Sequence, residues 1–394
     1  MANVLVTGGA GYVGSHACKA IRQAGFTPVA FDSLSTGWAE AVRYGPLFKG
    51  DLLNPAEVAA AFEIYQPVAV MHFAALSLVG EAMKDPGKYW RMNVCGALNL
   101  VEAAVAAGCR NFVFSSTCAV YGEHHGAALD ETSEQRPINA YGASKRAIED
   151  MLSNFRASHG LRHVIFRYFN VAGADPDGEI GEKHVPETHL IPLVLQAAYS
   201  QRGSLTVFGS DYPTPDGTCV RDYVHVCDLA EAHVAGLRWL LGGGDCQVFN
   251  LGAGRGYSVR EVIEAARELT GMDVPVQEAP RRGGDAPSLV SSSERAQRVL
   301  NWKPARSSLM QMLADATRWH LSMNGASVMP DAPSPQSPAT LRQVIASHGD
   351  DAPAPVLSAA PPPSHGSVSL GSELLRDVVS LGTEPQVQVR ERDL

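Results

Sequence analysis

Tyr141 and Lys145 lie four residues apart in a segment whose pattern predicts a helix over residues 140–159. Two side chains at this spacing share one face of a helix and can act on the same proton. A phenol has a usual pKa of about 10 and is a poor base at neutral pH, but a neighbouring ammonium favours its ionised form. The pair therefore predicts proton transfer by Tyr141 with help from Lys145, although ordinary surface pairs share this spacing.

A glycine-rich turn near the N-terminus is the second feature that could take part in chemistry. Gly8, Gly11 and Gly14 follow a predicted strand at 3–7 and precede an amphipathic segment at 15–24. Glycines let the backbone approach a pyrophosphate closely, and the helix N-terminus that follows attracts its charge. A glycine run alone could be an ordinary turn, but the strand before it and the helix after it favour a dinucleotide site.

Asp32 ends the second predicted strand, 18 residues after Gly14. A carboxylate at this place accepts hydrogen bonds from the adenosine ribose and repels a 2'-phosphate. No Arg or Lys follows before Arg43 to bind such a phosphate. The sequence therefore predicts NAD rather than NADP. Asp51 and Leu52, after the next predicted strand, are placed to contact the adenine.

The elements that must hold these residues alternate between strand and helix. Strands are predicted at 3–7, 27–31, 68–73, 111–115 and 163–168, and helices at 15–24, 55–65, 90–107 and 140–159. This alternation predicts an α/β fold with a Rossmann-type, doubly wound parallel sheet covered on both faces. From about Gly173 the pattern becomes irregular, which predicts a smaller α/β substrate-binding domain.

The sequence thus predicts three segments. An NAD-binding Rossmann domain spans 1–172, and a nucleotide-sugar-binding domain, partly interleaved with the first, spans 173–323. Residues 324–394 contain 10 of the 25 prolines and no aromatic residue, so this Pro/Ala/Ser-rich segment cannot bury enough surface to fold alone. We expect it to be a disordered tail.

The composition excludes several classes of protein. With 394 residues, of which 45% are hydrophobic, the chain can form a sizeable core. Its net charge of -9 argues against nucleic-acid binding. Its longest apolar runs are far shorter than the roughly 20 residues of a membrane helix, and the N-terminus lacks a signal peptide, so we expect a cytoplasmic protein with no membrane partner. Seven scattered cysteines without a CxxC pair favour reduced thiols over disulfides or zinc, and no metal is expected.

The motifs together resemble the extended short-chain dehydrogenase/reductase superfamily. The shared motifs are Thr7-Gly8-Gly9-Ala10-Gly11-Tyr12-Val13-Gly14, Asp32, Asn93, Ser115-Ser116-Thr117 and Tyr141-Gly142-Ala143-Ser144-Lys145. Five later segments resemble the UDP-glucose 4-epimerase family within it, namely RYFNVAGA at 167–174, VFGSDYPT at 207–214, GTCVRDYVHV at 217–226, NLGAG at 250–254 and RRGGD at 281–285. The resemblance covers residues 1–323, and the segments at 211–214 and 220–223 are its most specific parts.

The resemblance implies roles for individual residues. Tyr141 would be the catalytic base and acid, Lys145 would lower its pKa and bind the nicotinamide ribose, and Thr117 would hydrogen-bond the reacting sugar hydroxyl. The residues implied to bind NAD are Gly8, Gly11, Tyr12, Val13, Gly14, Asp32, Asp51, Leu52, Phe73, Ala74, Ala75, Ser77, Asn93, Thr117, Tyr141, Lys145 and Phe169. Ser77 stands where some relatives carry a Lys.

The resemblance also implies a site for a UDP-sugar. Its residues would be Thr117, Tyr141, Asn170, His189, Leu190, Thr206, Val207, Phe208, Arg221, Arg282, Asp285 and Leu289. Arg221 and Arg282 would hold the diphosphate, since each guanidinium can donate two parallel hydrogen bonds, although without the family they could be ordinary ion-paired arginines. Asp285 would accept from the uridine ribose, and the bulk of Leu289 would decide whether N-acetylated sugars enter. A homodimer through helices of the cofactor domain is also implied.

The activity implied is NAD-dependent interconversion of UDP-glucose and UDP-galactose at C4, through a transient 4-keto sugar, as in galactose metabolism. A nucleotide-sugar 4,6-dehydratase would need an Asp-Glu pair directly after Thr117, where this chain has Cys118 and Ala119. Another nucleotide-sugar epimerase is a further alternative. A non-catalytic NAD-sensing protein is disfavoured by the intact Thr117, Tyr141 and Lys145, although a fold alone does not determine function.

Overall fold

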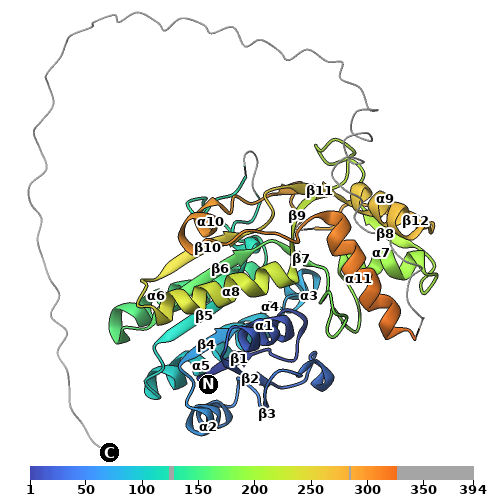
Figure 1. Cartoon of the computed structure of the whole chain (residues 1–394). Helices are drawn as coiled ribbons and strands as arrows, with labels where there is room; N and C mark the ends of the chain where they lie inside the picture. The colour runs from blue at the N-terminus through green and yellow to red at the C-terminus, as the bar shows by residue number, and fades with distance from the viewer. Residues whose placement is uncertain (124–127, 284, 326–394) are drawn as a thin grey trace, which may run out of the picture. The chain divides into compact units, whose positions relative to one another are not determined.

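A parallel sheet of seven strands forms the larger part of the structure (Figure 1). In a computed structural model of the chain, the described residues are 1–123, 128–283 and 285–325. The strands lie in the order β3 (Leu47–Lys49), β2 (Thr27–Asp32), β1 (Asn3–Thr7), β4 (Ala69–His72), β5 (Asn111–Thr117), β6 (Arg162–Tyr168) and β10 (Gln247–Leu251). The order reverses direction between β1 and β4, so the predicted Rossmann-type, doubly wound fold is confirmed.

Alternating side chains place the two faces of this sheet against different helices. Val4 and Val6 of β1 face α1 (Tyr12–Gln23), α8 (Val226–Leu241) and α10 (Glu294–Leu300), and all these elements share one hydrophobic core. Leu5 points to the other face, where α2 (Pro55–Tyr65), α5 (Gly96–Ala106) and α6 (Ala140–His159) pack. Figure 1 shows α1 and α8 together on one face of the sheet. Period-two alternation along the strand thus produces the three layers.

Two predicted helices differ from those observed. Helix α1 begins at Tyr12 rather than at 15, because Gly11 already accepts a hydrogen bond from the amide of Ser15 at 3.0 Å. The helix predicted over 90–107 is divided into a π-helical turn, η2 (Trp90–Cys95), followed by α5. Helices α2 and α6 and strand β1 have the predicted bounds.

A second lobe contains most of the later elements. Strand β9 (Val220–His225) pairs with β7 (Asn170–Ala172), β11 (Gly256–Ser258) and β13 (Ser288–Leu289), while β8 (Leu205–Phe208) pairs with β12 (Val276–Ala279). Helices α7 (Leu190–Ala198), α9 (Val259–Thr270) and α11 (Leu309–Met323) pack around a separate hydrophobic core. The chain nevertheless returns α8 and β10 to the first sheet. The division at residue 172 stays a prediction.

The remaining elements are short. They are the 3₁₀ turns η1 (Ala39–Ala41) and η3 (Cys118–Val120) and the helices α3 (Val79–Lys84) and α4 (Pro86–Tyr89). Among the described residues, no helix is both long and apolar enough to cross a membrane. The predicted tail, from residue 326 onward, lies outside the described residues.

Candidate active site

The carboxyl edge of the parallel sheet brings most of the predicted residues together. Strand β1 leads into the glycine turn, β2 ends at Asp32, β5 ends at Thr117, and Phe169 follows β6. In a doubly wound sheet, ligands bind at this edge where the strand order reverses. Here the reversal lies between β1 and β4, directly beside the glycine turn.

The glycine turn has the geometry of a dinucleotide cradle. Gly8 has φ of +74°, and a Cβ there would lie 2.7 Å from the amide nitrogen of Ala74. A Cβ on Gly14 would collide with the carbonyl oxygen of Gly8. Gly11 is the N-cap of α1 and has no side chain to cap its first N–H groups. These residues fit a bound pyrophosphate, because the backbone is open to close approach and the helix N-terminus is not capped by a side chain.

Asp32 is held rigidly at the end of β2. Its carboxylate accepts hydrogen bonds from the amides of Ala10 at 3.0 Å and Leu34 at 2.9 Å. Burial raises the pKa of Asp32, and these two hydrogen bonds act in the opposite direction. Further along this edge, Asp51 accepts from the amide of Leu53 at 2.9 Å, and Leu52 is buried against the helices of its face.

Asn93 fastens the segment after β4 to the rest of the site. Its Oδ1 accepts from the amide of Leu76 at 2.8 Å, and its Nδ2 donates to the Leu76 carbonyl at 3.1 Å and to Ser144 Oγ at 3.0 Å. The amides of Phe73 and Ala74 donate to the carbonyl of Thr7 at 3.0 and 3.1 Å. The segment 73–76 is therefore tied both to β1 and to α6. Ala75 lies within it half-buried, and Ser77 after it is exposed.

Tyr141 and Lys145 lie buried on the same face of α6, as their spacing predicts. Lys145 Nζ donates to the carbonyl of Ser115 at 2.8 Å, and Thr117 hydrogen-bonds Tyr141. Burial raises the pKa of Tyr141, and the Thr117 hydrogen bond only partly opposes this effect. Burial also lowers the pKa of Lys145 to about 7, against the attraction of Glu149. Desolvation of Tyr141 thus outweighs the expected lowering of its pKa.

A buried network beneath Lys145 was missed by the sequence reasoning. Glu149 accepts from Ser116 Oγ at 2.5 Å and from Arg167 Nη2 at 2.6 Å. Arg167 also donates to Tyr121 at 3.1 Å, whose hydroxyl donates to Asn250 at 2.6 Å. The available signal was the spacing, since Glu149 follows Lys145 by four residues just as Lys145 follows Tyr141. The network fixes Ser116 near the end of β5, beside the Ser115 carbonyl that accepts a hydrogen bond from Lys145.

The structure brings Arg221, Arg282 and Asp285 together in the second lobe. Arg282 donates to the carboxylate of Asp285 through Nε at 3.0 Å and Nη2 at 3.1 Å. Arg221 Nη2 lies 3.8 Å from the same carboxylate, and its Nη1 donates to the carbonyls of Val220 and Ala286. The side chain of Arg221 is 13% exposed and that of Arg282 is 54% exposed. The two guanidiniums thus share the carboxylate of Asp285 and could both turn to a diphosphate.

Other predicted substrate residues surround this arginine pair. The Arg282 guanidinium lies 5.7 Å from the ring centre of Phe208, which ends β8 after Thr206 and Val207. Leu289 is paired with Arg221 across β13 and β9. The side chain of Leu289 packs against the hydrophobic cluster that contains Cys118 and Phe169, next to the catalytic edge. Asn170, another predicted substrate residue, is the first residue of β7.

Three predicted residues make notable contacts within the chain. His189 is the N-cap of α7 and Leu190 its first residue, but His189 Nδ1 faces Glu182 Oε1 at 2.8 Å and Glu187 Oε1 at 2.9 Å. The Tyr12 hydroxyl donates to the carbonyl of Gly173 at 2.6 Å. Val13 packs against the core. Any contact of Tyr12 and Val13 with a cofactor would therefore come from their backbone.

Comparisons with known proteins place these features in context. The chain matches the family described as NAD dependent epimerase/dehydratase family over residues 4–252. It is 48% identical over 321 residues to UDP-glucose 4-epimerase of Rhizobium leguminosarum bv. trifolii, with 82% of this chain and 98% of that enzyme covered.

Solved structures agree with the sequence comparison. UDP-glucose 4-epimerase from Brucella ovis in complex with NAD is similar with a TM-score of 0.79 and 46% identity, over 80% of this chain and 98% of that one. The enzyme from Bifidobacterium longum in complex with NAD+ and UDP gives a TM-score of 0.78 and 31% identity, over 83% and 100%.

Proposed function

This chain belongs to the NAD dependent epimerase/dehydratase family, and we propose that it interconverts UDP-glucose and UDP-galactose by NAD-dependent epimerisation at C4. The observation that carries the proposal is the buried set of Thr117, Tyr141 and Lys145 at the edge of the sheet where its strand order reverses. The similarity of the chain to UDP-glucose 4-epimerases extends over nearly the whole length of those enzymes.

The chain holds NAD along the carboxyl edge. The backbone at Gly8, Gly11 and Gly14 binds the pyrophosphate, and Asp32 accepts from the adenosine ribose. Other proposed contacts are Tyr12, Val13, Asp51, Leu52, Phe73, Ala74, Ala75, Ser77, Asn93, Thr117, Tyr141, Lys145 and Phe169. When bound, NAD supplies the reversible oxidation of the sugar carbon and a positively charged ring.

Tyr141 takes the proton of the sugar 4-hydroxyl and later returns it, while Thr117 hydrogen-bonds that hydroxyl. Ionising an unperturbed phenol at pH 7 costs roughly 4 kcal/mol, since about three pKa units separate the two values. Burial of Tyr141 adds to this cost. Lys145 in its charged form offsets part of it, and the same amine would hydrogen-bond the nicotinamide ribose.

Arg221 and Arg282 hold the diphosphate while the 4-keto sugar turns and presents its other face. Asp285, which joins both arginines, exchanges this contact for a hydroxyl of the uridine ribose. The other proposed sugar and uridine contacts are Asn170, His189, Leu190, Thr206, Val207, Phe208 and Leu289. Leu289 stands beside the reacting edge, where its bulk limits the size of the group on C2.

The nearest alternative is a nucleotide-sugar 4,6-dehydratase, which must remove water across C5 and C6. Cys118 and Ala119 take the places of the acid and base that this step needs. Burial raises the pKa of the Cys118 thiol to about 12, so it does not exchange protons at neutral pH. A protein that only senses NAD would not require the intact Thr117, Tyr141 and Lys145.

Product analysis separates these three functions. The purified chain is incubated with UDP-glucose and NAD, and the nucleotide sugars are separated by chromatography and weighed by mass spectrometry. We expect a product of unchanged mass that co-elutes with UDP-galactose. A product lighter by one water would establish the dehydratase instead, and unchanged substrate would leave only the sensing protein.

We also propose a cytoplasmic homodimer that pairs through helices of the cofactor domain. All seven cysteines lie in described segments and are free thiols, which suits a reducing compartment. Light scattering on the full chain would measure the mass of the assembly.

A further inference from the structure

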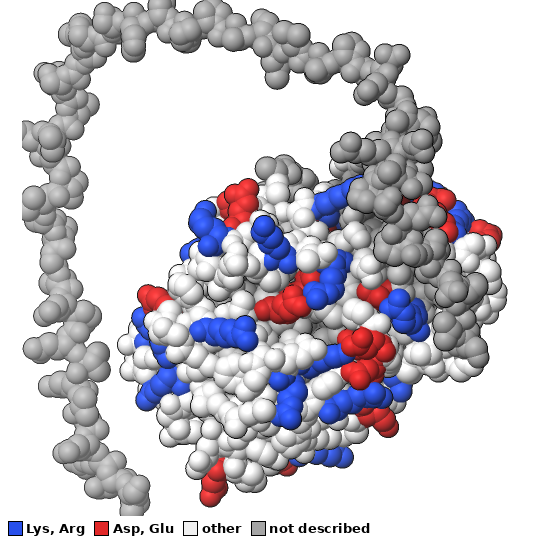
Figure 2. All heavy atoms as spheres, in the orientation of Figure 1, with Lys and Arg blue, Asp and Glu red and all other residues white. Residues whose placement is uncertain are grey.

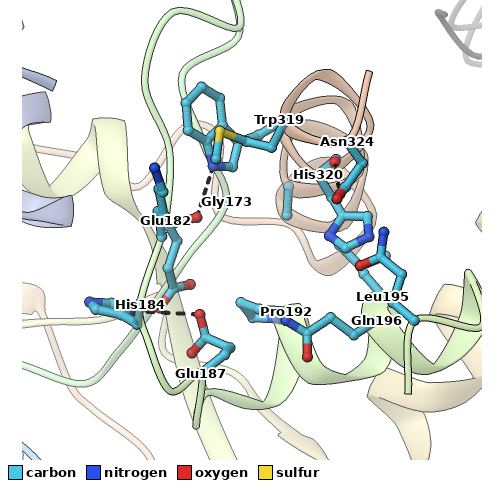
Figure 3. A pocket seen from close by; sticks show the side chains of 14 residues that line it. Gly173, Glu182, His184, Glu187, Pro192, Leu195, Gln196, Trp319, His320 and Asn324 are labelled. Carbon is cyan, nitrogen blue, oxygen red and sulfur yellow. Dashed lines mark hydrogen bonds and ion pairs between the residues drawn. The ribbon is translucent and has the colours of Figure 1, made fainter. Parts of the chain in front are cut away.

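We propose that Glu182, His184, Glu187 and His189, between β7 and α7, form a zinc-binding site. Each residue offers one ligand atom, and these four atoms all lie within 4.8 Å of one another. Figure 3 shows the side chains of Glu182, His184 and Glu187 gathered at one wall of a pocket. Imidazole nitrogen and carboxylate oxygen are ligands that Zn²⁺ accepts in tetrahedral sites.

The distances between these atoms approach those of a zinc tetrahedron. His189 Nδ1 lies 2.8 Å from Glu182 and 2.9 Å from Glu187, while His184 Nδ1 lies 3.2 Å and 3.6 Å from the same two carboxylates. Zinc–ligand bonds of about 2.0–2.2 Å separate the ligands of a tetrahedron by roughly 3.4 Å. These histidine–carboxylate distances lie within roughly 0.6 Å of that separation, with Glu187 facing His189 through Oε1 and His184 through Oε2.

His184 contributes a nitrogen whose hydrogen bonding is incomplete. Its Nδ1 is buried and lies 3.2 Å from Glu182 Oε1 and 3.6 Å from Glu187 Oε2, which is within ion-pair distance but without the geometry of a hydrogen bond among the described residues. A metal ion between these groups would give the buried nitrogen a partner. The carboxylates are also well buried, with side chains of Glu182 and Glu187 only 8% and 7% exposed. Such groups need positive charge beside them.

The surrounding elements hold the ligands in place. The carbonyl of Glu182 accepts from the indole of Trp319 on α11 at 2.8 Å, and the ring of Tyr12 lies edge-on to His184 with centroids 6.5 Å apart. His189 is the N-cap of α7. A cavity of about 180 Å³, lined also by Pro192, gives an ion access to Glu182, His184 and Glu187 (Figure 3).

A second acidic group in the chain shows the contrast. Asp175, Asp177 and Glu179 also bring their carboxylates together, but the Nζ of Lys19 lies 2.8, 2.8 and 3.0 Å from them. This group already has its cation. In the zinc cluster, the alternative to the metal is a pair of protonated imidazoles, which would balance the two carboxylates equally well. Measurement of bound metal therefore decides between them.

One consequence rests on the proposed function. With Nδ1 of His189 bound to zinc, its Nε2 keeps a proton and becomes a fixed donor for the nucleotide sugar. Zinc binding itself is measured without turnover, so its failure and failure of the epimerase assignment are distinguishable.

The test measures zinc on the full chain purified without a histidine tag. The chain is stripped with a chelator, dialysed, and titrated with zinc sulfate, and bound metal is measured by mass spectrometry after gel filtration. Cys95, an exposed thiol, is changed by Cys95→Ser in every sample so that it cannot hold zinc. We expect one zinc per chain, and an affinity more than about 100-fold weaker in His184→Gln, since even residues behind the ligands contribute 10–100-fold. His159→Gln, at an exposed histidine of α6, is the matched control and should bind like the parent.

A second readout uses Lys183, which lies between two of the ligands. Zinc should slow tryptic cleavage after Lys183 about 10-fold in the parent and leave the rate in His184→Gln unchanged, because ligation holds the segment closed. If His184→Gln does not fold, as judged by circular dichroism, Glu187→Gln takes its place in both measurements. Absence of bound zinc in the parent, or equal zinc in the parent and ligand variants, would overturn the proposal.

Discussion

At the scale of single residues, burial decides the charge of the central pair. Lys145 is 2% exposed, and within the described part of the chain its amine donates to a neutral carbonyl, that of Ser115. Its pKa of about 7 therefore lies near physiological pH. Tyr141, buried beside it, has a raised pKa and stays protonated.

The lysine makes the stability of the cofactor-free protein depend on pH. Between its folded pKa of about 7 and the ordinary value of 10.5, Lys145 is neutral in the folded chain and protonated in the unfolded chain. Raising the pH within this window makes protonation of Lys145 in the unfolded chain less favourable. The free energy of unfolding therefore increases by up to about 1.4 kcal/mol per pH unit. Below the window both states hold the proton, and the destabilisation is constant.

Urea unfolding of the parent and of Lys145→Met tests this sign, because methionine carries no titrating proton. From about pH 7.5 to pH 9, the parent should gain about 2 kcal/mol relative to the variant. A constant difference between the two proteins across this range would contradict the account.

The arginine pair makes a prediction about binding. Arg282→Ala should raise the dissociation constant for UDP about 10–100-fold, since a hydrogen bond to a charged group is worth about 1.5–3 kcal/mol. The matched control is Arg281→Ala, because the neighbouring Arg281 pairs with Asp211 and packs on Tyr212 instead. Isothermal titration would measure both. Equal losses in the two variants would show that Arg282 has no special role.

Residues whose roles depend on local spacing could be predicted from the sequence. The glycine turn and Asp32 follow from the ends of predicted strands, and Tyr141 and Lys145 follow from one helical turn, whereas the role of Thr117 was implied by the family resemblance. The link from Glu149 to Arg167 could not be predicted, because a contact between two elements depends on how they pack. The grouping of His184 and His189 with Glu182 and Glu187 could not be predicted, because it depends on how the loop between β7 and α7 folds.

At the scale of elements, the π-helical turn is the clearest departure from the sequence prediction. The segment 90–107 has a helical pattern throughout, and hydrophobic period cannot distinguish a single wide turn from a regular one. The structure places Asn93 in this turn, 1% exposed, with three hydrogen bonds to Leu76 and Ser144. Such turns are frequent at functional sites, and this one holds the loop beside the cofactor edge.

Asn93→Ala should therefore weaken both the fold and cofactor retention. We expect a loss of about 1–3 kcal/mol in unfolding free energy, because the backbone groups of Leu76 lose their buried partner. Less NAD should also remain with the chain after gel filtration. Asn154→Ala, at an exposed asparagine of α6, is the control and should behave like the parent. Unchanged stability and NAD content in Asn93→Ala would show that the clamp is unimportant.

At the scale of the whole molecule, the sequence predicted the sheet but not which later elements join it. Strand β10 and helix α8 lie more than 50 residues after β6, yet they complete the first sheet and its helical layer. Local patterns do not say which sheet a strand joins. Figure 2 shows basic and acidic side chains close together on the face displayed.

The central claim is that Tyr141 gives back the proton it takes while NAD is regenerated, and one measurement tests it most directly. Purified full chain is mixed with UDP-galactose, without added NAD, and UDP-glucose is followed over time. We predict conversion by the parent and a rate about 100- to 10,000-fold lower in Tyr141→Phe, with UDP binding unchanged. Tyr44→Phe, which removes a hydroxyl that donates to Glu179, is the control and should convert the sugar like the parent. Conversion by Tyr141→Phe at the parent's rate, or none by the parent even after NAD is supplied, would contradict the account.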